Sequence, residues 1–101
     1  MAYVLIEEII KPSTVKWSTV YNSNVYTSNA TIVNNWAQAQ PGLKKLFHHT
    51  AHENVEEIVY VFDNTLDGDT FKVALDTNEN FKNIETFYAI NGITIGWSLV
   101  S

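Results

Sequence analysis

The chain contains no cysteine and no arginine. Its 101 residues include six basic side chains, all of them lysine. Without cysteine there is no disulfide framework, no thiolate nucleophile and no cysteine-ligated zinc or iron–sulfur cluster. Without arginine the chain lacks the bidentate group that usually binds phosphates and guanine edges. The eleven acidic residues give a formal charge of −5, which repels polyanions. We therefore expect no nucleic-acid partner.

Long apolar runs, glycine and proline are also scarce. The apolar start of the chain is interrupted by Glu7 and Glu8, and it has no basic residues before it. The run is too short for a membrane span, and it lacks the pattern of a signal peptide. We expect no membrane partner and a cytoplasmic location. Hydrophobic residues, in contrast, make up 46% and aromatic residues 13%. This composition and length predict a single globular domain over residues 1–101.

Alternating or continuous apolar residues predict four strands. The predicted strands cover residues 3–10, 43–52, 57–62 and 93–100, and the short polar segment 53–56 fits a hairpin connection. In the last strand large side chains alternate with Thr94, Gly96 and Ser98. The first and third of these strands carry apolar residues on both faces.

Two segments show helical spacing. A helix is predicted to begin near Thr27 and to end at Gln40-Pro41-Gly42, and a second to follow residues 76–78 and end at Asn91-Gly92. Three other segments are less regular. Residues 13–24 are predicted to be mostly irregular, although a turn and a short helix fit equally well. Residues 63–69 are predicted to form a turn-rich loop, and residues 70–75 one or two helical turns.

The predicted order is β-α-β-β-α-β, which is the α+β ferredoxin-like arrangement of a four-stranded antiparallel sheet with both helices on one face. An antiparallel sheet with one face in water normally alternates apolar and polar residues. The first and third strands do not, and their second face would expose an unusually large apolar patch. We therefore predict a symmetric homodimer in which the two open faces pack together.

This layout resembles a known superfamily. The first strand ends in Ile9-Ile10-Lys11-Pro12, and the first long helix leads through Gln40-Pro41-Gly42-Leu43 into a charged hairpin and a phenylalanine-rich helix. In these features the chain resembles the dimeric α/β-barrel superfamily of ferredoxin-like proteins, close to the antibiotic-biosynthesis monooxygenase-like group. The resemblance implies two subunits that form one barrel, with a small-molecule pocket between sheet and helices in each.

The known relatives in this superfamily include cofactor-free oxygenases acting on aromatic polyketides, haem-degrading enzymes, isomerases and members without an assigned activity. The haem-degrading relatives use a histidine on the second helix, but residues 77–91 contain none. Their pocket also pairs an asparagine with a tryptophan, whereas the first strand here carries Ile6 and apolar neighbours. We therefore expect no cofactor.

The three histidines lie close together in the sequence, at His48, His49 and His52. On a helix His48 and His52 would converge, but on a strand they lie ~13 Å apart at roughly 3.3 Å per residue. One metal ion cannot bridge that span, so we expect no metal site. His49 points to the opposite face, where it could serve as a general base or hold a carboxylate in a pocket. A position at a sheet edge or dimer contact explains all three equally well.

Glu7 and Glu8 interrupt an apolar strand, so one should point toward each face of the sheet. A carboxyl in a dry environment would have a raised pKa, as groups that exchange protons during catalysis often do. The alternatives are that this part of the strand lies at the rim of the sheet, or that a lysine such as Lys16, Lys44 or Lys45 pairs with the carboxylate.

Aromatic residues are the other candidate for a site, although ordinary core packing explains them too. They could line a pocket for an apolar ligand, fatty-acid-like or polyketide-like, with His49, Tyr88 or a lysine at its polar end and Gly96 and Ser98 leaving room. The candidate ligand-binding residues are Trp36, His49, Tyr60, Phe62, Phe81, Tyr88 and Trp97.

Two functions follow from these candidates. One is a homodimer that binds an apolar small molecule without reaction, and the other is a cofactor-free monooxygenase or isomerase acting on an apolar carbonyl compound through a histidine–glutamate acid–base group. The sequence leaves open whether the protein is an enzyme. The second function requires a histidine and a carboxylate that converge on the cavity, and both require a cavity larger than about 300 Å³.

Overall fold

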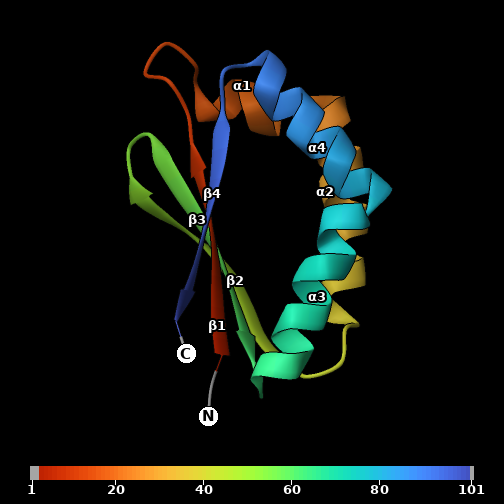
Figure 1. Ribbon diagram of the computed structural model, residues 1–101. Coiled ribbons are helices and arrows are strands. Elements are labelled where there is room, and N and C mark those ends of the chain that lie inside the picture. Colours follow the sequence, from red (N-terminus) through yellow and green to blue (C-terminus); the bar gives the residue numbers. More distant parts are fainter. Residues whose placement is uncertain (1–2, 101) are drawn as a thin grey trace.

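The computed structural model describes residues 3–100. A four-stranded antiparallel sheet has the order β2-β3-β1-β4, and helices cover only one of its faces (Figure 1). No helix within this range is long and apolar enough to cross a membrane. The strands are β1 (Tyr3–Ile10), β2 (Leu43–His52), β3 (Val55–Phe62) and β4 (Thr94–Val100).

Each of the two crossover connections contains a pair of helices. The first pair is α1 (Trp17–Tyr21) and α2 (Asn24–Gln38), and the second is α3 (Thr65–Thr77) and α4 (Glu79–Ile90). The predicted ferredoxin-like fold class is confirmed, with two helices in each connection where we predicted one long helix. The end of α4 is also confirmed, since Gly92 takes a positive φ of 73° just after Asn91.

The segment predicted as mostly irregular contains α1, and α2 begins three residues earlier than expected. Helix α1 is only five residues long and has no side-chain cap. It is held by tertiary contacts: Val20 is 1% exposed, and the indole Nε1 of Trp17 donates to the carbonyl oxygen of Glu53 at 2.9 Å. Such contacts can order a helix that local propensity would leave unformed.

The predicted loop over residues 63–69 is wrong for most of its length, because α3 begins at Thr65. The side-chain oxygen of Asn64 accepts a hydrogen bond from the backbone N–H of Asp67 at 2.9 Å, which caps the helix. Asp67, Gly68 and Asp69 of the predicted loop belong to the first turns of this helix. Gly68 is buried there against the ring of Tyr3, which leaves no room for a Cβ atom.

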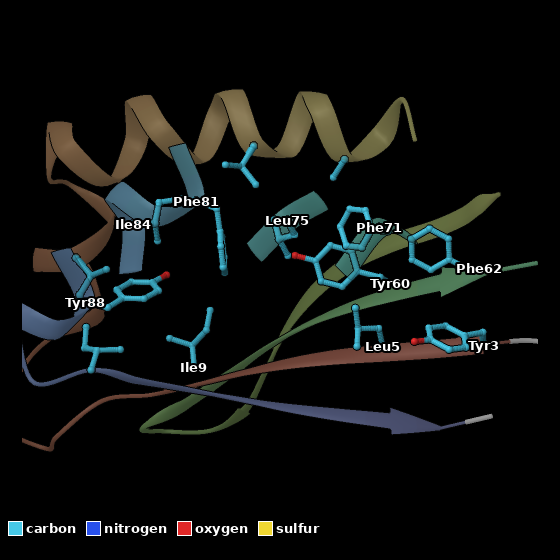
Figure 2. Close-up of a cluster of buried hydrophobic side chains, with 14 residues drawn as sticks. Tyr3, Leu5, Ile9, Tyr60, Phe62, Phe71, Leu75, Phe81, Ile84 and Tyr88 are labelled. Atoms are coloured by element: carbon cyan, nitrogen blue, oxygen red, sulfur yellow. The ribbon is translucent and has the colours of Figure 1, made fainter. Parts of the chain in front are cut away.

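The hydrophobic core lies between the covered face of the sheet and the helices (Figure 2). Alternate residues of β1 point into it, and Ile9 is fully buried. Phe71 and Leu75 reach the core from α3, and Phe81 and Ile84 from α4. Phe71 packs between Tyr60 and Phe62, with ring centroids 4.9 and 5.1 Å away. The side chains of β1 and β3 that face the helices therefore set the distance between the sheet and the helices.

The other face of the sheet, which we call the open face, carries three cross-strand rows in its centre. Two rows are largely apolar, and the third is polar. In order from β2 to β4 the rows are Lys45, Val61, Val4 and Val100; Phe47, Val59, Ile6 and Ser98; and His49, Glu57, Glu8 and Gly96. Val59 is only 6% exposed, yet it lies outside the core cluster.

The strand at one edge of the sheet, β2, is irregular. Its pairing with β3 shifts register between Leu43 and Lys45 and again between Thr50 and His52. Most of its residues are exposed. This strand therefore borders both the open face and the space beneath α2.

Candidate functional site

A cavity of about 480 Å³ lies between the covered face of the sheet and helix α2. Its walls come from α2, α4 and the three strands β1, β2 and β3. Exposed residues of α2 and β2 border it, so it opens between these two elements. The lining residues are Glu7, Tyr26, Ala30, Thr31, Val33, Asn34, Ala37, Gln38, Leu46, Phe47, His48, Ile58, Tyr60, Phe81, Ile84 and Tyr88.

The inner end of the cavity holds the carboxyl group of Glu7. This residue is 2% exposed, and its Oε1 accepts a hydrogen bond from the Tyr60 hydroxyl at 3.0 Å. Burial raises the pKa of Glu7 to about 7, with a smaller rise from Glu85, while Tyr60 and Lys72 oppose the increase. Of the alternatives that the sequence left open for the two adjacent glutamates, burial with a raised pKa therefore holds for Glu7.

Three tyrosine hydroxyls surround this carboxyl. The rings of Tyr26 and Tyr88 lie close together, with centroids 6.0 Å apart, and Figure 2 shows the hydroxyls of Tyr60 and Tyr88 pointing toward one another. Burial is the main cause that raises the pKa of each of the three above its usual value, and the charge of Glu7 adds to the rise in all of them. The hydroxyls therefore stay protonated at neutral pH and can donate hydrogen bonds as well as accept them.

A second polar group borders the cavity at its opening. The Nε2 of His48 lies 2.9 Å from Oε1 of Glu56, and the Tyr21 hydroxyl donates to the same oxygen at 3.1 Å. Glu56 is 7% exposed, and its other oxygen, Oε2, is buried without a hydrogen-bond partner among residues 3–100. Glu56 thus fixes the orientation of a histidine that is itself 38% exposed.

The sheet register brings these two polar groups into one row. Glu7 pairs with Ile58 of β3, and Ile58 pairs with His48 of β2. Two strand spacings of about 4.8 Å place the Cα atoms of Glu7 and His48 roughly 10 Å apart on the covered face. A molecule lying over Ile58 would therefore have a carboxyl on one side and an imidazole on the other.

The structure brings three of the seven predicted ligand-binding residues to the cavity, namely Tyr60, Phe81 and Tyr88. Phe62 is fully buried in the core. Trp36 stacks on Phe71 with centroids 5.4 Å apart, outside the cavity lining.

The remaining two predicted residues lie elsewhere. Trp97 lies beneath Lys72, whose Nζ is 4.5 Å from its ring. His49 is on the open face, where its Nε2 is 2.9 Å from Oε1 of Glu57. Alternation along β2 was predicted correctly, but the histidine on the cavity side is His48. The faces are fixed by pairing with Ile58, which the spacing of the histidines does not reveal.

Two residues of the site were missed from the sequence. Tyr26 was placed before the predicted start of the helix, although it lies in the first turn of α2. Glu56 was assigned to a hairpin connection and belongs to β3. A signal for Glu56 was present, since it precedes Ile58, Tyr60 and Phe62 at a spacing of two and so shares their face.

No protein-family model matches the chain, and no curated protein matches its sequence. Solved structures match its fold over nearly the whole length. Rv0793 from Mycobacterium tuberculosis is 6% identical with a TM-score of 0.65, covering 100% of this chain and 94% of that chain. SnoaB from Streptomyces nogalater, a cofactor-independent oxygenase, is 15% identical with a TM-score of 0.59, covering 99% and 91%.

A dimeric ferredoxin-like protein of unknown function from a Jannaschia species is 11% identical, with a TM-score of 0.53, and the match covers 94% of this chain and 97% of that one. Of these three structures, one is described as a cofactor-independent oxygenase and one as a dimeric ferredoxin-like protein. At these identities they establish the fold, and the fold-level resemblance predicted from the sequence layout is confirmed.

The pKa of Glu7 predicts how the stability of the protein depends on pH. The pKa is 4.5 in the unfolded chain and about 7 in the folded protein, so the folded state binds more protons between these values. Stability therefore falls as pH rises through this window, by about 3 kcal/mol in total. Between pH 5 and pH 8 the free energy of unfolding of the variant Glu7→Gln should fall by about 2–3 kcal/mol less than that of the wild type. Urea unfolding at the two pH values measures this difference.

The matched control is Glu79→Gln, which removes the same charge from an exposed position. It should keep the pH dependence of the wild type. If Glu7→Gln loses as much stability as the wild type between these two pH values, Glu7 is not buried as described.

Proposed function

We propose that the protein is a homodimer in which each subunit binds an apolar small molecule in the cavity between the sheet and α2. The cavity itself carries the proposal. A volume of about 480 Å³ is in the range of small-molecule sites, which are mostly apolar with a few placed polar groups. Here the ionisable groups gather at two points, Glu7 with its tyrosines and His48 with Glu56. Helix α2 adds the neutral polar side chains of Thr31, Asn34 and Gln38.

The walls also narrow the kind of ligand. Between residues 3 and 100 no lysine lines the cavity, and the inner end already holds a carboxyl group. A fatty-acid-like carboxylate placed there would meet a like charge without a compensating cation. A polyketide-like body with a neutral or cationic polar end fits these groups better.

Filling the cavity should abolish binding. Ala37 lines it and is 1% exposed, so the larger side chain of Ala37→Leu projects into the ligand space. With 1-naphthalenemethanol as the probe, titration calorimetry should show binding to the wild type and at least tenfold weaker binding to this variant. The control Ala89→Leu adds the same volume at an exposed position of α4 and should bind as the wild type does.

Native mass spectrometry should find one probe molecule per subunit. The proposal fails if no apolar probe binds the wild type. It also fails if Ala37→Leu unfolds cooperatively in urea yet binds the probe unchanged.

Dimerisation through the open face is supported by its side chains. Ile6 and Val59 form the middle of a largely apolar row on a face that no helix covers. Exposed apolar side chains continue toward the edges at Phe47, 38% exposed, and Val100, 56% exposed. A second copy presenting the same face would bury them all. The similar structure from the Jannaschia species is described as dimeric.

A charge in the middle of the open face should break the dimer. Size-exclusion chromatography with light scattering should give twice the 11.5 kDa chain mass for the wild type and the monomer mass for Ile6→Lys. The control Val73→Lys changes a residue of α3 that is 67% exposed and should stay dimeric. A monomeric wild type at 100 μM would refute dimerisation and leave ligand binding to be judged by calorimetry.

A second function is a cofactor-free oxygenase or isomerase acting on an apolar carbonyl compound. The observation that favours it is the row containing Glu7, Ile58 and His48, which sets a proton acceptor opposite a protonatable carboxyl. His48, oriented by Glu56, would remove a proton next to the carbonyl, and the Glu7–Tyr60 pair would hydrogen-bond the carbonyl oxygen. The similarity in fold to SnoaB, a cofactor-independent oxygenase, agrees with such chemistry.

Proton exchange tests this second function without knowledge of the natural substrate. The protein should accelerate exchange of the α-hydrogens of 2-tetralone for deuterium in D₂O, followed by proton NMR. His48→Gln should slow the exchange by about 10²-fold, a usual contribution of a general base. His49→Gln on the open face is the control and should have no effect. An exchange rate equal to that of buffer would rule out this reaction and leave ligand binding intact.

A further inference from the structure

The inner end of the cavity has an unbalanced negative charge. Glu7 forms no ion pair with any lysine of residues 3–100, and its side chain accepts a hydrogen bond from Tyr60. The cation that contributes to the field at Glu7 is Lys72, but its Nζ lies 2.7 and 2.9 Å from the two carboxylate oxygens of Asp76. Glu85 adds further negative potential at the same place.

The groups around Glu7 include oxygen atoms that can accept hydrogen bonds. The phenol oxygens of Tyr26 and Tyr88 line the same part of the cavity and interact with the charge of Glu7. An ammonium group has three N–H donors, so it can bind the carboxylate and two such oxygens at once. Phe81 adds an aromatic ring to the wall, and aromatic rings attract cations when water is excluded.

The net charge of the chain has the same sign as the charge of Glu7. The chain as a whole has a formal charge of −5. Charge of one sign along a cleft with low-dielectric walls concentrates ligands of the opposite sign. The net charge of the protein and the inner end of its cavity therefore both favour a cation over an anion.

We propose that the ligand carries a cationic amine on an apolar body, with the amine bound by Glu7 and the hydroxyls of Tyr26 and Tyr88. This inference rests on the proposed ligand-binding function and names its ligand class. It also accounts for a carboxyl group that lowers the stability of the free protein, because the bound ammonium supplies the counter-charge that the chain does not.

Three probes with one ring system and different polar ends test the inference at pH 8 and 150 mM salt. The probes are 1-naphthylmethylamine, 1-naphthalenemethanol and 1-naphthoate. Calorimetry should show the amine binding at least tenfold more tightly than the alcohol, and the carboxylate binding most weakly. In Glu7→Gln the preference for the amine should disappear while the alcohol still binds, which shows that the variant is folded. Glu79→Gln should keep the preference.

Each other outcome points to a different failure. If the alcohol binds as tightly as the amine, or the carboxylate binds most tightly, the inference is wrong and the ligand-binding function stands. If Glu7→Gln and Glu79→Gln weaken amine binding equally, the amine is held by surface charge and the inference is again wrong. If none of the three probes binds the wild type, the proposed function itself fails.

Discussion

The structure depends on the alternation of side chains along β1, the strand that pairs with both β3 and β4. Leu5, Glu7 and Ile9 point toward the helices, while Ile6 and Glu8 point to the open face. A shift of one residue in the pairing would exchange the two sets. Most positions of β1 would then only exchange one aliphatic side chain for another, so the aliphatic residues alone do not select the register. The register is favoured by the aromatic residues on the covered side, above all Tyr60, whose hydroxyl donates a hydrogen bond to Glu7.

Packing on this face explains why a cavity exists in so small a domain. Phe71 packs against Tyr60 and Phe62 at one end, and Tyr26 packs against Phe87 and Tyr88 at the other, with ring centroids 6.5 and 6.0 Å apart. Such large rings keep helices and sheet apart, and the small side chains of α2 between them, including Ala30 and Ala37, leave space unfilled. The carboxyl group of Glu7 is therefore held by a tyrosine that is itself packed against Phe71.

The sequence was sufficient for the strands and the fold class, because alternation and β-branched residues act locally. It left open whether a glutamate of the first strand is buried. It was insufficient where contacts between residues far apart in the sequence decide whether a helix forms or which face a side chain takes. Helix α1 exists through the burial of Val20, and the start of α3 depends on a cap at Asn64 that looks like a turn. The cavity residues from α4 were predictable from helical spacing. His48 was not, since only the pairing of β2 with β3 decides which histidine faces inward.

The irregular pairing of β2 also bears on how the protein avoids aggregation. A regular edge strand offers its free N–H and C=O groups to any extended chain. On β2 two shifts of register make that edge irregular. Lys44 and Lys45 lie at the first of these shifts and add charge there. An incoming strand would have to match the shifts and bury the lysines at the same time. The exposed edge next to the cavity opening can thus stay accessible to small molecules while it resists extension of the sheet.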